Sequence, residues 1–253
     1  MSAATLQEDE IHVWYARTAS CNTPRLQAYY RTLLSPAELA RLEQFSFEEL
    51  KLEYLVTRAL CRTTLSTYAT MPPQNWRFRE NEYGRPEVDY GDEPSRLRFN
   101  LSNTPGLVAC AVSRAADIGI DLEDTGRSCD IEAIAGHCFS VEEQRTLRRL
   151  PAERRREYFF ALWTLKESYV KARGVGLSIP LEQISFDLSG DPIRVAFHPD
   201  RSEIASSWQF ALFSPDDRHQ MALGIRYPQQ QRVRILVREI VPGMDKLDRH
   251  LMV

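Results

Sequence analysis

"SVEEQRTLRRL" (Ser140–Leu150) begins with a serine that is followed three residues later by Glu143. This is the pattern of a capping box, in which the serine side chain accepts from the glutamate backbone N–H and the glutamate side chain accepts from the serine N–H. The same pattern occurs in "SPAELARLEQF" (Ser35–Phe45), where Pro36 also occupies the first helical position. Both stretches are therefore predicted to open helices.

The likeness between these two stretches extends to the sequence around them. Four further pairs of segments match at an offset of about 107 residues: the strands "IHVWYA" from Ile11 and "IGIDLE" from Ile118, the helical patterns about 47–69 and about 152–173, the strands "NWRF" from Asn75 and "QISF" from Gln183, and the hairpins "FNLSNTPGLVACAV" from Phe99 and "FALFSPDDRHQMALGI" from Phe210. A repeat of this length predicts an internal duplication. Chance similarity of hydrophobic patterns is the alternative.

The duplication predicts an α+β fold that is a pseudo-dimer of two similar lobes. Each lobe would be a small antiparallel sheet packed with a long helix. The N-terminal lobe is predicted over 1–115 and the C-terminal lobe, which would carry the metal site, over 116–227. Residues 228–253 would form a C-terminal tail outside the repeat.

The composition is that of an ordinary globular chain. Its 253 residues are 43% hydrophobic and 26% charged, and the net charge of -3 argues against general affinity for nucleic acid. No run of about 18 apolar residues predicts a membrane helix, and the polar N-terminus does not resemble an export signal. The five dispersed cysteines lack CxxC spacing, which argues against disulfides and against a zinc site. We therefore expect a cytoplasmic, monomeric protein that binds neither nucleic acid nor membrane.

Two carboxylates share one face of the strand "ADIGIDLED". Alternation puts Asp121 and Glu123 on the side of Gly119, about 7 Å apart along the strand. Without a partner, the two carboxylates would repel and raise each other's pKa. A cation bound between them would offset this repulsion. Gly119 would let a ligand approach the backbone closely. A solvated strand face is the alternative that needs no ligand.

The helix "WTLKESYVKARG" (Trp163–Gly174) adds charges beside bulky apolar residues. Glu167 and Lys171 lie one turn apart on the face of Trp163, and Lys166 lies next to that face. Glu167 would add a third oxygen ligand to the site on the strand, and the lysines would hold phosphate. Three carboxylates suit Mg²⁺ better than a Ca²⁺ cage, and the absence of a cysteine or HxxxH ligand set excludes ordinary zinc. An intrahelical pair between Glu167 and Lys171 is the alternative.

"GIDLED" followed by "WTLKESYVKARGVGL" closely resembles the signature of the 4'-phosphopantetheinyl transferases, G-(I/V)-D-x-E and then W-x-x-K-E-(S/A)-x-x-K. Three upstream elements, "SPAELARL", "EYGRPEV" and "FNLSNTPGLVACAV", match the longer, two-lobed class that activates peptide and polyketide synthases, the surfactin-synthetase-activating type. The matches follow the family order from Ser35 to about Ser185. The pseudo-dimeric fold of that family agrees with the duplication.

The resemblance implies transfer of the 4'-phosphopantetheine group of coenzyme A to a serine of an apo carrier protein. The reaction would depend on Mg²⁺ and release adenosine 3',5'-bisphosphate. By their place in the motifs, Asp121, Glu123 and Glu167 would hold the metal, and Glu167, or a metal-bound water near it, would take the serine proton. Lys171 would stabilise charge on the pyrophosphate, with Lys166 as a helper. Such a set suits phosphoryl transfer, which needs positioning and charge neutralisation more than covalent help.

The resemblance also implies contacts to coenzyme A from the first half of the chain. Arg41 matches a basic position that contacts the 3'-phosphate, although a solvated helix arginine is the alternative. Arg85 replaces a more usual lysine and would reach phosphate as a planar fork. Ser102 and Asn103 sit where the family commonly has Ser-His. Asn103 is a departure, because an amide donates a hydrogen bond to phosphate but cannot carry the charge of an imidazolium, which puts affinity and pH dependence in doubt.

The implied partners are acyl or peptidyl carrier protein domains. The sequence does not single out carriers of fatty acid, polyketide, nonribosomal peptide or lysine biosynthesis. An arginine-rich segment is the candidate docking surface for an acidic carrier helix, with a solvated basic face as the alternative: Arg145, Arg148, Arg149, Arg154, Arg155 and Arg156. A non-catalytic module that binds coenzyme A or carriers, and a generic Mg²⁺-dependent nuclease or phosphatase, are the rival functions.

Overall fold

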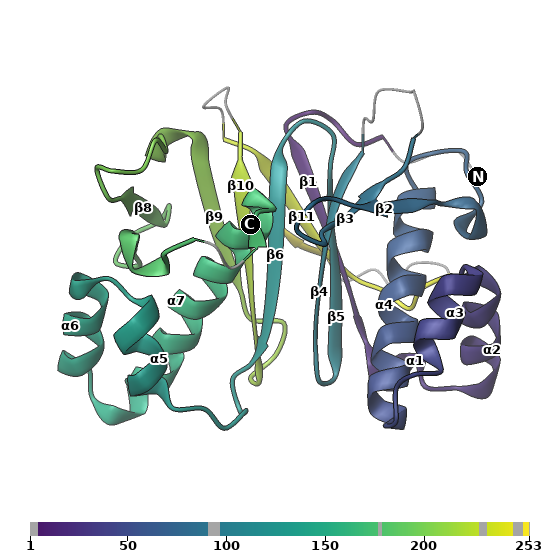
Figure 1. Ribbon diagram of the computed structural model, residues 1–253, viewed down its shortest axis with the longest axis horizontal. Coiled ribbons are helices and arrows are strands. Elements are labelled where there is room, and N and C mark those ends of the chain that lie inside the picture. The colour runs from purple at the N-terminus through teal and green to yellow at the C-terminus, as the bar shows by residue number, and fades with distance from the viewer. Residues whose placement is uncertain (1–4, 91–96, 177–178, 228–231, 245–249, 253) are drawn as a thin grey trace. The chain divides into compact units, whose positions relative to one another are not determined.

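Residues 5–90, 97–176, 179–227, 232–244 and 250–252 are described by the computed structural model. The chain divides into an N-terminal unit, Met1–Asn81 with Pro86–Ala115 and Val233–Val253, and a C-terminal unit, Glu82–Arg85 with Ala116–Arg232. Both units contain helices and β-sheet, so the predicted α+β class is confirmed (Figure 1). None of the described helices has the length and apolar character needed to cross a membrane.

A five-stranded sheet of order β12-β11-β1-β5-β4 forms the centre of the N-terminal unit. β4 and β5 form an antiparallel hairpin, β1 pairs antiparallel with β5, and β11 pairs parallel with β1 and antiparallel with β12. The strands of this sheet are β1 Glu10–Arg17, β4 Arg98–Thr104, β5 Leu107–Ser113, β11 Arg234–Glu239 and β12 His250–Met252. The segment predicted as a tail thus supplies two strands, while its residues 228–231, 245–249 and 253 lie outside the described residues.

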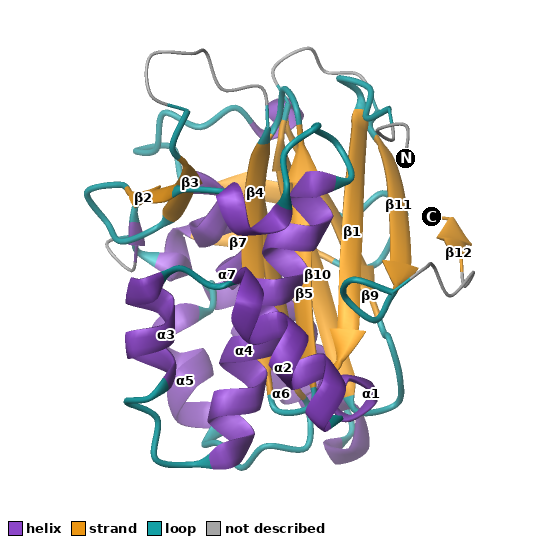
Figure 2. Ribbon diagram, turned by 90° about the vertical axis from the view of Figure 1, so that its right-hand side faces the viewer, coloured by secondary structure: helices purple, strands orange, loops and turns teal. Residues whose placement is uncertain are grey.

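The helices of the N-terminal unit pack around α4, which lies against β5, β4 and β1 (Figure 2). α4 buries Leu55, Val56, Ala59 and Leu60 in the core of this unit. The predicted capping box at Ser35 is present and opens α3. The remaining elements are α1 Thr18–Cys21, α2 Pro24–Leu33, α3 Pro36–Leu42, α4 Glu48–Ser66, η1 Pro73–Asn75, β2 Phe78–Glu80 and β3 Pro86–Val88.

The C-terminal unit contains a three-stranded antiparallel sheet of order β6-β10-β9 and a separate hairpin of β7 and β8. The long helix α7 packs on β6 and β10, and the predicted capping box at Ser140 opens α6. Gly174 ends α7 in the left-handed conformation, with φ at 65°. The elements are β6 Asp117–Asp124, α5 Ile131–Cys138, α6 Val141–Arg149, α7 Ala152–Arg173, η3 Leu181–Gln183, β7 Ile184–Asp187, β8 Arg194–Phe197, η4 Ala205–Ser207, β9 Trp208–Phe213 and β10 His219–Arg226.

The two units repeat one succession of elements. The order β1-β5-β4 in the first corresponds to β6-β10-β9 in the second, and each set is a leading strand followed by a hairpin. In both units a capped helix and then a long helix stand between the leading strand and the hairpin. The predicted pair of similar lobes is therefore confirmed. The sheet of the first lobe differs from the prediction at one ladder, because β11 joins it in parallel.

Two glycines allow α7 to lie close to its sheet. Gly119 on β6 is in register with Gly224 on β10. A Cβ added at Gly119 would lie 2.1 Å from the carbonyl oxygen of Ser168 and 2.2 Å from the backbone nitrogen of Ala172. The expectation that Gly119 leaves room for a ligand is therefore wrong, because the α7 backbone fills that space. The close contact brings the carboxylate-bearing face of β6 up to the half of α7 that contains Glu167 and Lys171.

Candidate functional site

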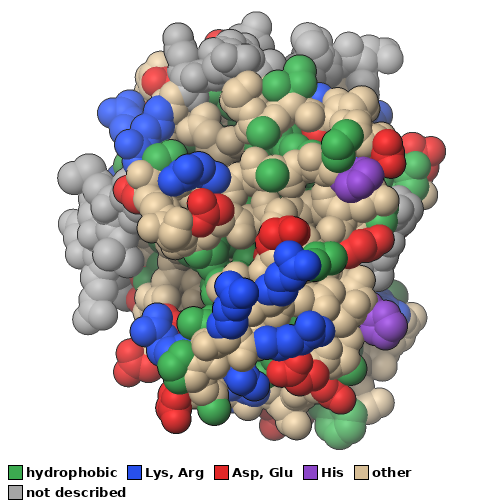
Figure 3. Space-filling model, turned by 90° about the vertical axis from the view of Figure 1, so that its left-hand side faces the viewer, with side chains coloured by type: hydrophobic (Ala, Val, Ile, Leu, Met, Phe, Trp, Pro, Cys, Tyr) green, Lys and Arg blue, Asp and Glu red, His purple; other side chains and the backbone are tan. Residues whose placement is uncertain are grey.

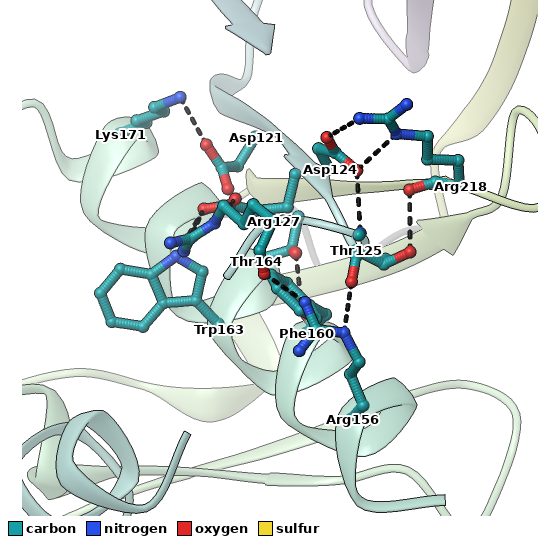
Figure 4. A network of polar contacts seen from close by, with 12 residues as sticks. Asp121, Asp124, Thr125, Arg127, Arg156, Phe160, Trp163, Thr164, Lys171 and Arg218 are labelled. Carbon is teal, nitrogen blue, oxygen red and sulfur yellow. Dashed lines mark hydrogen bonds and ion pairs between the residues drawn. The ribbon is translucent and has the colours of Figure 1, made fainter. Parts of the chain in front are cut away.

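Asp121 and Lys171 join β6 to α7 at the centre of the candidate site. Lys171 Nζ lies 2.6 Å from Asp121 Oδ1 (Figure 4). The Asp121 side chain is 7% exposed, whereas the Lys171 side chain keeps 29% of its surface exposed at the end of the helix. The strand and the helix that the sequence assigned to one site therefore do converge. This contact places a partly exposed ammonium group beside a nearly buried carboxylate.

Glu123 lies further along the same strand and is held from two sides. Trp163 Nε1 donates to Glu123 Oε1 at 2.6 Å, and Arg127 Nε donates to Glu123 Oε2 at 2.8 Å. Burial and the charge of Asp121 raise the pKa of Glu123, while Arg127 and Trp163 lower it. Trp163 was placed on this face by helical spacing, but Arg127 was not identified. Its position four residues after Glu123 is the only sequence signal that points to it.

The turn after β6 is fixed by a second set of arginine contacts, which Figure 4 shows below and beside the carboxylates. Arg156 on α7 donates to the carbonyl oxygens of Thr125 and Arg127, and its guanidinium lies 5.0 Å from the ring centroid of Phe160. Arg218 donates to both oxygens of Asp124, from Nε to Oδ1 at 2.8 Å and from Nη2 to Oδ2 at 2.6 Å. Arg127 is thus held in place at its backbone, which fixes where its side chain meets Glu123.

Glu167 is the third carboxylate of the site. Its Oε1 atom is buried and makes no hydrogen bond within the described part of the chain. Burial first, and then the negative charges of Asp121 and Glu123, raise the pKa of Glu167 to about 7, against a lowering by Lys171. These mutual effects show that the three carboxyl groups and Lys171 share one electrostatic environment. A buried carboxylate oxygen without a donor is costly to keep ionised, so a cationic ligand would stabilise it.

The carboxylates are not arranged as a finished metal site. Among the described residues, no group of three or more His, Cys, Asp or Glu side chains is placed to hold a metal ion. The contacts above give the reason, because the carboxylate oxygens already accept hydrogen bonds. Lys171 donates to Asp121, while Trp163 and Arg127 donate to Glu123. Oxygen donors alone still suit Mg²⁺. The donor chemistry therefore fits this ion, although Asp121 and Glu123 would first have to exchange their present partners for it.

Lys166 has a structural position in place of the catalytic one expected. Its side chain is fully buried, and Nζ lies 2.9 Å from Glu143 Oε2, 2.9 Å from the carbonyl oxygen of Leu181 and 2.5 Å from that of Ile184. Burial lowers the pKa of Lys166 and the Glu143 charge raises it. Three oxygen partners use all three N–H donors of the ammonium group. Lys166 therefore ties α7 to α6 and to the start of β7, away from Asp121.

Arg85 is also engaged by backbone groups. Its guanidinium donates to the carbonyl oxygens of Lys171 at 2.8 Å, Ala172 at 3.1 Å and Ile118 at 3.1 Å. The first two bonds satisfy carbonyls in the last turn of α7, which have no partners within the helix, and the third reaches a carbonyl on β6. Arg85 thus fixes the end of the helix that carries Lys171. Its predicted contact to phosphate stays a prediction.

The other predicted contacts to coenzyme A lie in the N-terminal unit. Arg41 is exposed at the end of α3, where Nη1 donates to Gln44 Oε1 at 2.8 Å. Ser102 is buried on β4, opposite Ala109 on β5. Asn103 is exposed, and its Nδ2 donates to Glu53 Oε1 at 2.5 Å. Asn103 therefore faces a carboxylate on α4 that the sequence analysis did not assign to the site.

The arginine-rich segment of α6 and α7 is only partly free to meet a partner. Lysine and arginine side chains gather among acidic ones on the face shown in Figure 3. Arg154 pairs with Glu157 at 2.9 Å, and Arg156 is turned to backbone carbonyls. Arg148 and Arg149, in the last turn of α6, remain exposed. These two are the best placed of the predicted docking arginines.

Two family models match the chain. The one described as "4'-phosphopantetheinyl transferase superfamily" matches residues 117–224, and the one described as "4'-phosphopantetheinyl transferase, N-terminal" matches residues 23–115. The 4'-phosphopantetheinyl transferase HetI of Nostoc sp. is 34% identical over 221 residues, which are 87% of this chain and 90% of that protein. The chain belongs to the 4'-phosphopantetheinyl transferase family.

Another phosphopantetheinyl transferase, Sfp of Bacillus subtilis, is 32% identical over 162 residues, 64% of this chain and 70% of that protein. Among solved structures, Thermotoga maritima holo-[acyl-carrier-protein] synthase matches with a TM-score of 0.38 and 26% identity, over 44% of this chain and 62% of that chain. The resemblance inferred from the motifs is confirmed. This phosphopantetheinyl transferase is an enzyme of the two-lobed class, with one family model on each half of the chain.

Proposed function

We propose that this transferase moves the 4'-phosphopantetheine group of coenzyme A onto a serine of an apo carrier protein, in a reaction that requires Mg²⁺. Adenosine 3',5'-bisphosphate is the second product. The observation that carries the proposal is the convergence of Asp121 on β6 with Lys171 on α7, next to the unsatisfied Glu167 carboxylate. A cluster that combines carboxylates with an accessible ammonium group suits a substrate with a pyrophosphate and its counter-ion.

Three carboxylates are the proposed ligands of the metal. Glu167 offers a buried oxygen without a hydrogen-bond donor in the described chain, and Asp121 and Glu123 offer oxygens now held by cations and an indole. Mg²⁺ held there would neutralise charge on the pyrophosphate oxygens. Lys171, once it turns from Asp121, reaches outward from a partly exposed position and stabilises charge on the same group.

The remaining residues position the two substrates. Glu167 is the proposed acceptor of the serine proton, because a base must titrate near the working pH to act efficiently. Arg41 is the proposed contact of the 3'-phosphate, since it is exposed and no ion pair between described residues engages it. Arg85 keeps the end of α7 in place and is the proposed source of a further positive charge for the pyrophosphate beside Lys171.

The test is the mass of an apo carrier protein after incubation with the enzyme, coenzyme A and Mg²⁺. Carriers of the fatty acid, polyketide and nonribosomal peptide types should be offered in parallel, each with a matched control in which the acceptor serine is alanine. We expect at least one carrier to gain the mass of one phosphopantetheine group, and to gain none with chelator or in the serine-to-alanine control. Binding of coenzyme A and carriers with no gain in mass would favour the non-catalytic module instead.

A further inference from the structure

A pocket of about 360 Å³ in the N-terminal unit has Asn103 in its lining. α4 contributes Glu53, Tyr54 and Arg58 to its lining, β4 contributes Asn103, and Phe45 lies on the segment before α4. The volume falls in the range of small-molecule sites, and the two aromatic rings provide apolar walls. The pocket therefore has the size and composition to receive one end of a nucleotide-like donor.

Glu53 gives this pocket a negative charge. The residue is 9% exposed, and its Oε1 accepts from Asn103 Nδ2 at 2.5 Å. None of the ion pairs between described residues includes Glu53. Burial raises the pKa of the Glu53 carboxyl, and the hydrogen bond from Asn103 lowers it. The amide of Asn103 thus donates to the Glu53 carboxylate, and both residues line the pocket.

The cations near the pocket only partly offset this charge. The Arg58 guanidinium lies 5.2 Å from the Tyr54 ring centroid, and its Nε is 3.8 Å from Glu38 Oε1. Arg41 does not line the pocket, but its guanidinium lies 5.4 Å from the ring centroid of Phe45, which does. Arg58 thus pairs with Glu38, and Arg41 is exposed to solvent.

A carboxylate in a ribose-binding pocket acts in opposite ways on a phosphorylated and on an unphosphorylated ribose. A buried carboxylate repels a phosphate dianion at short range, because both groups are negative and little water lies between them. The same carboxylate accepts hydrogen bonds from free ribose hydroxyls. Dinucleotide-binding folds show the contrast: an acidic residue there binds the hydroxylated ribose, and an arginine accommodates the phosphorylated one. Glu53 matches the first arrangement.

We propose that Glu53, positioned by Asn103, cancels most of the binding that a 3'-phosphate would contribute, so that this enzyme uses donors with an unphosphorylated ribose about as well as coenzyme A. This inference rests on the proposed function. With 3'-dephospho-coenzyme A, the serine oxygen bonds to the phosphorus next to the pantetheine arm, the bond from that phosphorus to the bridging oxygen breaks, and the serine proton passes to the base. The leaving group is adenosine 5'-monophosphate.

The experiment compares kcat/KM for coenzyme A and for 3'-dephospho-coenzyme A, with the same apo carrier. For the unmodified enzyme we expect kcat/KM for coenzyme A to be less than ten times kcat/KM for 3'-dephospho-coenzyme A. Glu53→Gln removes the charge but keeps the shape and the oxygen that Asn103 contacts, so the ratio should rise at least about tenfold, equivalent to about 1.4 kcal/mol, through better use of coenzyme A. Glu49→Gln, an exposed position one turn earlier on α4, is the matched control and should leave the ratio unchanged.

A ratio above ten for the unmodified enzyme, or a ratio that Glu53→Gln leaves unchanged, would overturn the inference. If Glu53→Gln does not fold, inhibition of the unmodified enzyme decides: adenosine 3',5'-bisphosphate and adenosine 5'-monophosphate should inhibit within tenfold of each other, and a larger advantage of the bisphosphate contradicts the role of Glu53. Absence of transfer from either donor to every carrier would instead count against the proposed function itself.

Discussion

Replacing Glu167 by glutamine should stabilise the protein more at pH 8 than at pH 5. The structure holds this carboxyl in a partly buried position, with one buried oxygen that lacks a hydrogen-bond donor in the described chain. Burial and the neighbouring acids raise its pKa from the ordinary value of 4.5 to about 7. A glutamine keeps the shape and remains neutral at every pH. The substitution therefore removes only the cost of ionising the side chain in the folded state.

The sign and size of the effect follow from linkage between folding and protonation. Below pH 4.5 the carboxyl is protonated in both states, so the two proteins should be similar. Between pH 4.5 and about 7 the unfolded chain ionises first, and the free energy of unfolding of the unmodified protein falls as pH rises. The full difference between the two pKa values corresponds to about 3 kcal/mol. Because water reaches part of the side chain, we expect about 1 to 2 kcal/mol at pH 8.

The assay is urea unfolding at pH 5 and pH 8 in the presence of chelator, since a bound cation would favour the ionised form. Glu153→Gln, at an exposed position of the same helix, serves as the control and should show a small difference that does not depend on pH. A Glu167→Gln variant whose stability relative to the unmodified protein is the same at both pH values would show that the Glu167 pKa is not raised in the folded state.

Three further substitutions test other parts of the structure. Gly119→Ala should lower stability by about 3 kcal/mol in thermal unfolding, because its Cβ would overlap the α7 backbone, whereas Gly136→Ala, with open space around it, should cause no loss. Lys166→Met should cost about 3 to 5 kcal/mol by leaving a buried glutamate unpaired, and an unchanged unfolding midpoint would argue against that ion pair. Reversing Arg148 and Arg149 to Glu should slow transfer to an acidic carrier and flatten its dependence on salt, with the KM for coenzyme A unchanged; carrier kinetics that are insensitive to salt would place the docking surface elsewhere.

The parts of the fold that sequence reasoning predicted are those with local signals. A capping box depends on residues three apart, so Ser35 and Ser140 were sufficient to predict where α3 and α6 begin. The period of α7 and the alternation of β6 put Glu167 and Asp121 on the correct faces, because side-chain direction follows from the chain positions alone. The duplication then predicted that the two lobes repeat one succession of elements along the chain, which single segments do not specify.

The errors and omissions depend on contacts between distant segments. Helical spacing put Lys166 beside Glu167, but it gave no indication that Glu143 of α6 would meet it inside the core. A glycine next to two acids suggested space for a ligand, while the α7 backbone occupies that space at Gly119. The parallel pairing of β11 with β1 joins the two ends of the chain, and no local pattern in either strand encodes such a partner.

The rate of transfer by Glu167→Gln tests the central claim most directly, because Glu167 is proposed both as a ligand of the metal and as the base. It should be measured at saturating coenzyme A and apo carrier in Mg²⁺, beside Glu153→Gln on the same helix and with thermal unfolding as a check on folding. We expect a loss of about 100-fold or more for Glu167→Gln and an unchanged rate for Glu153→Gln. A folded Glu167→Gln enzyme that turns over at the full rate would contradict it.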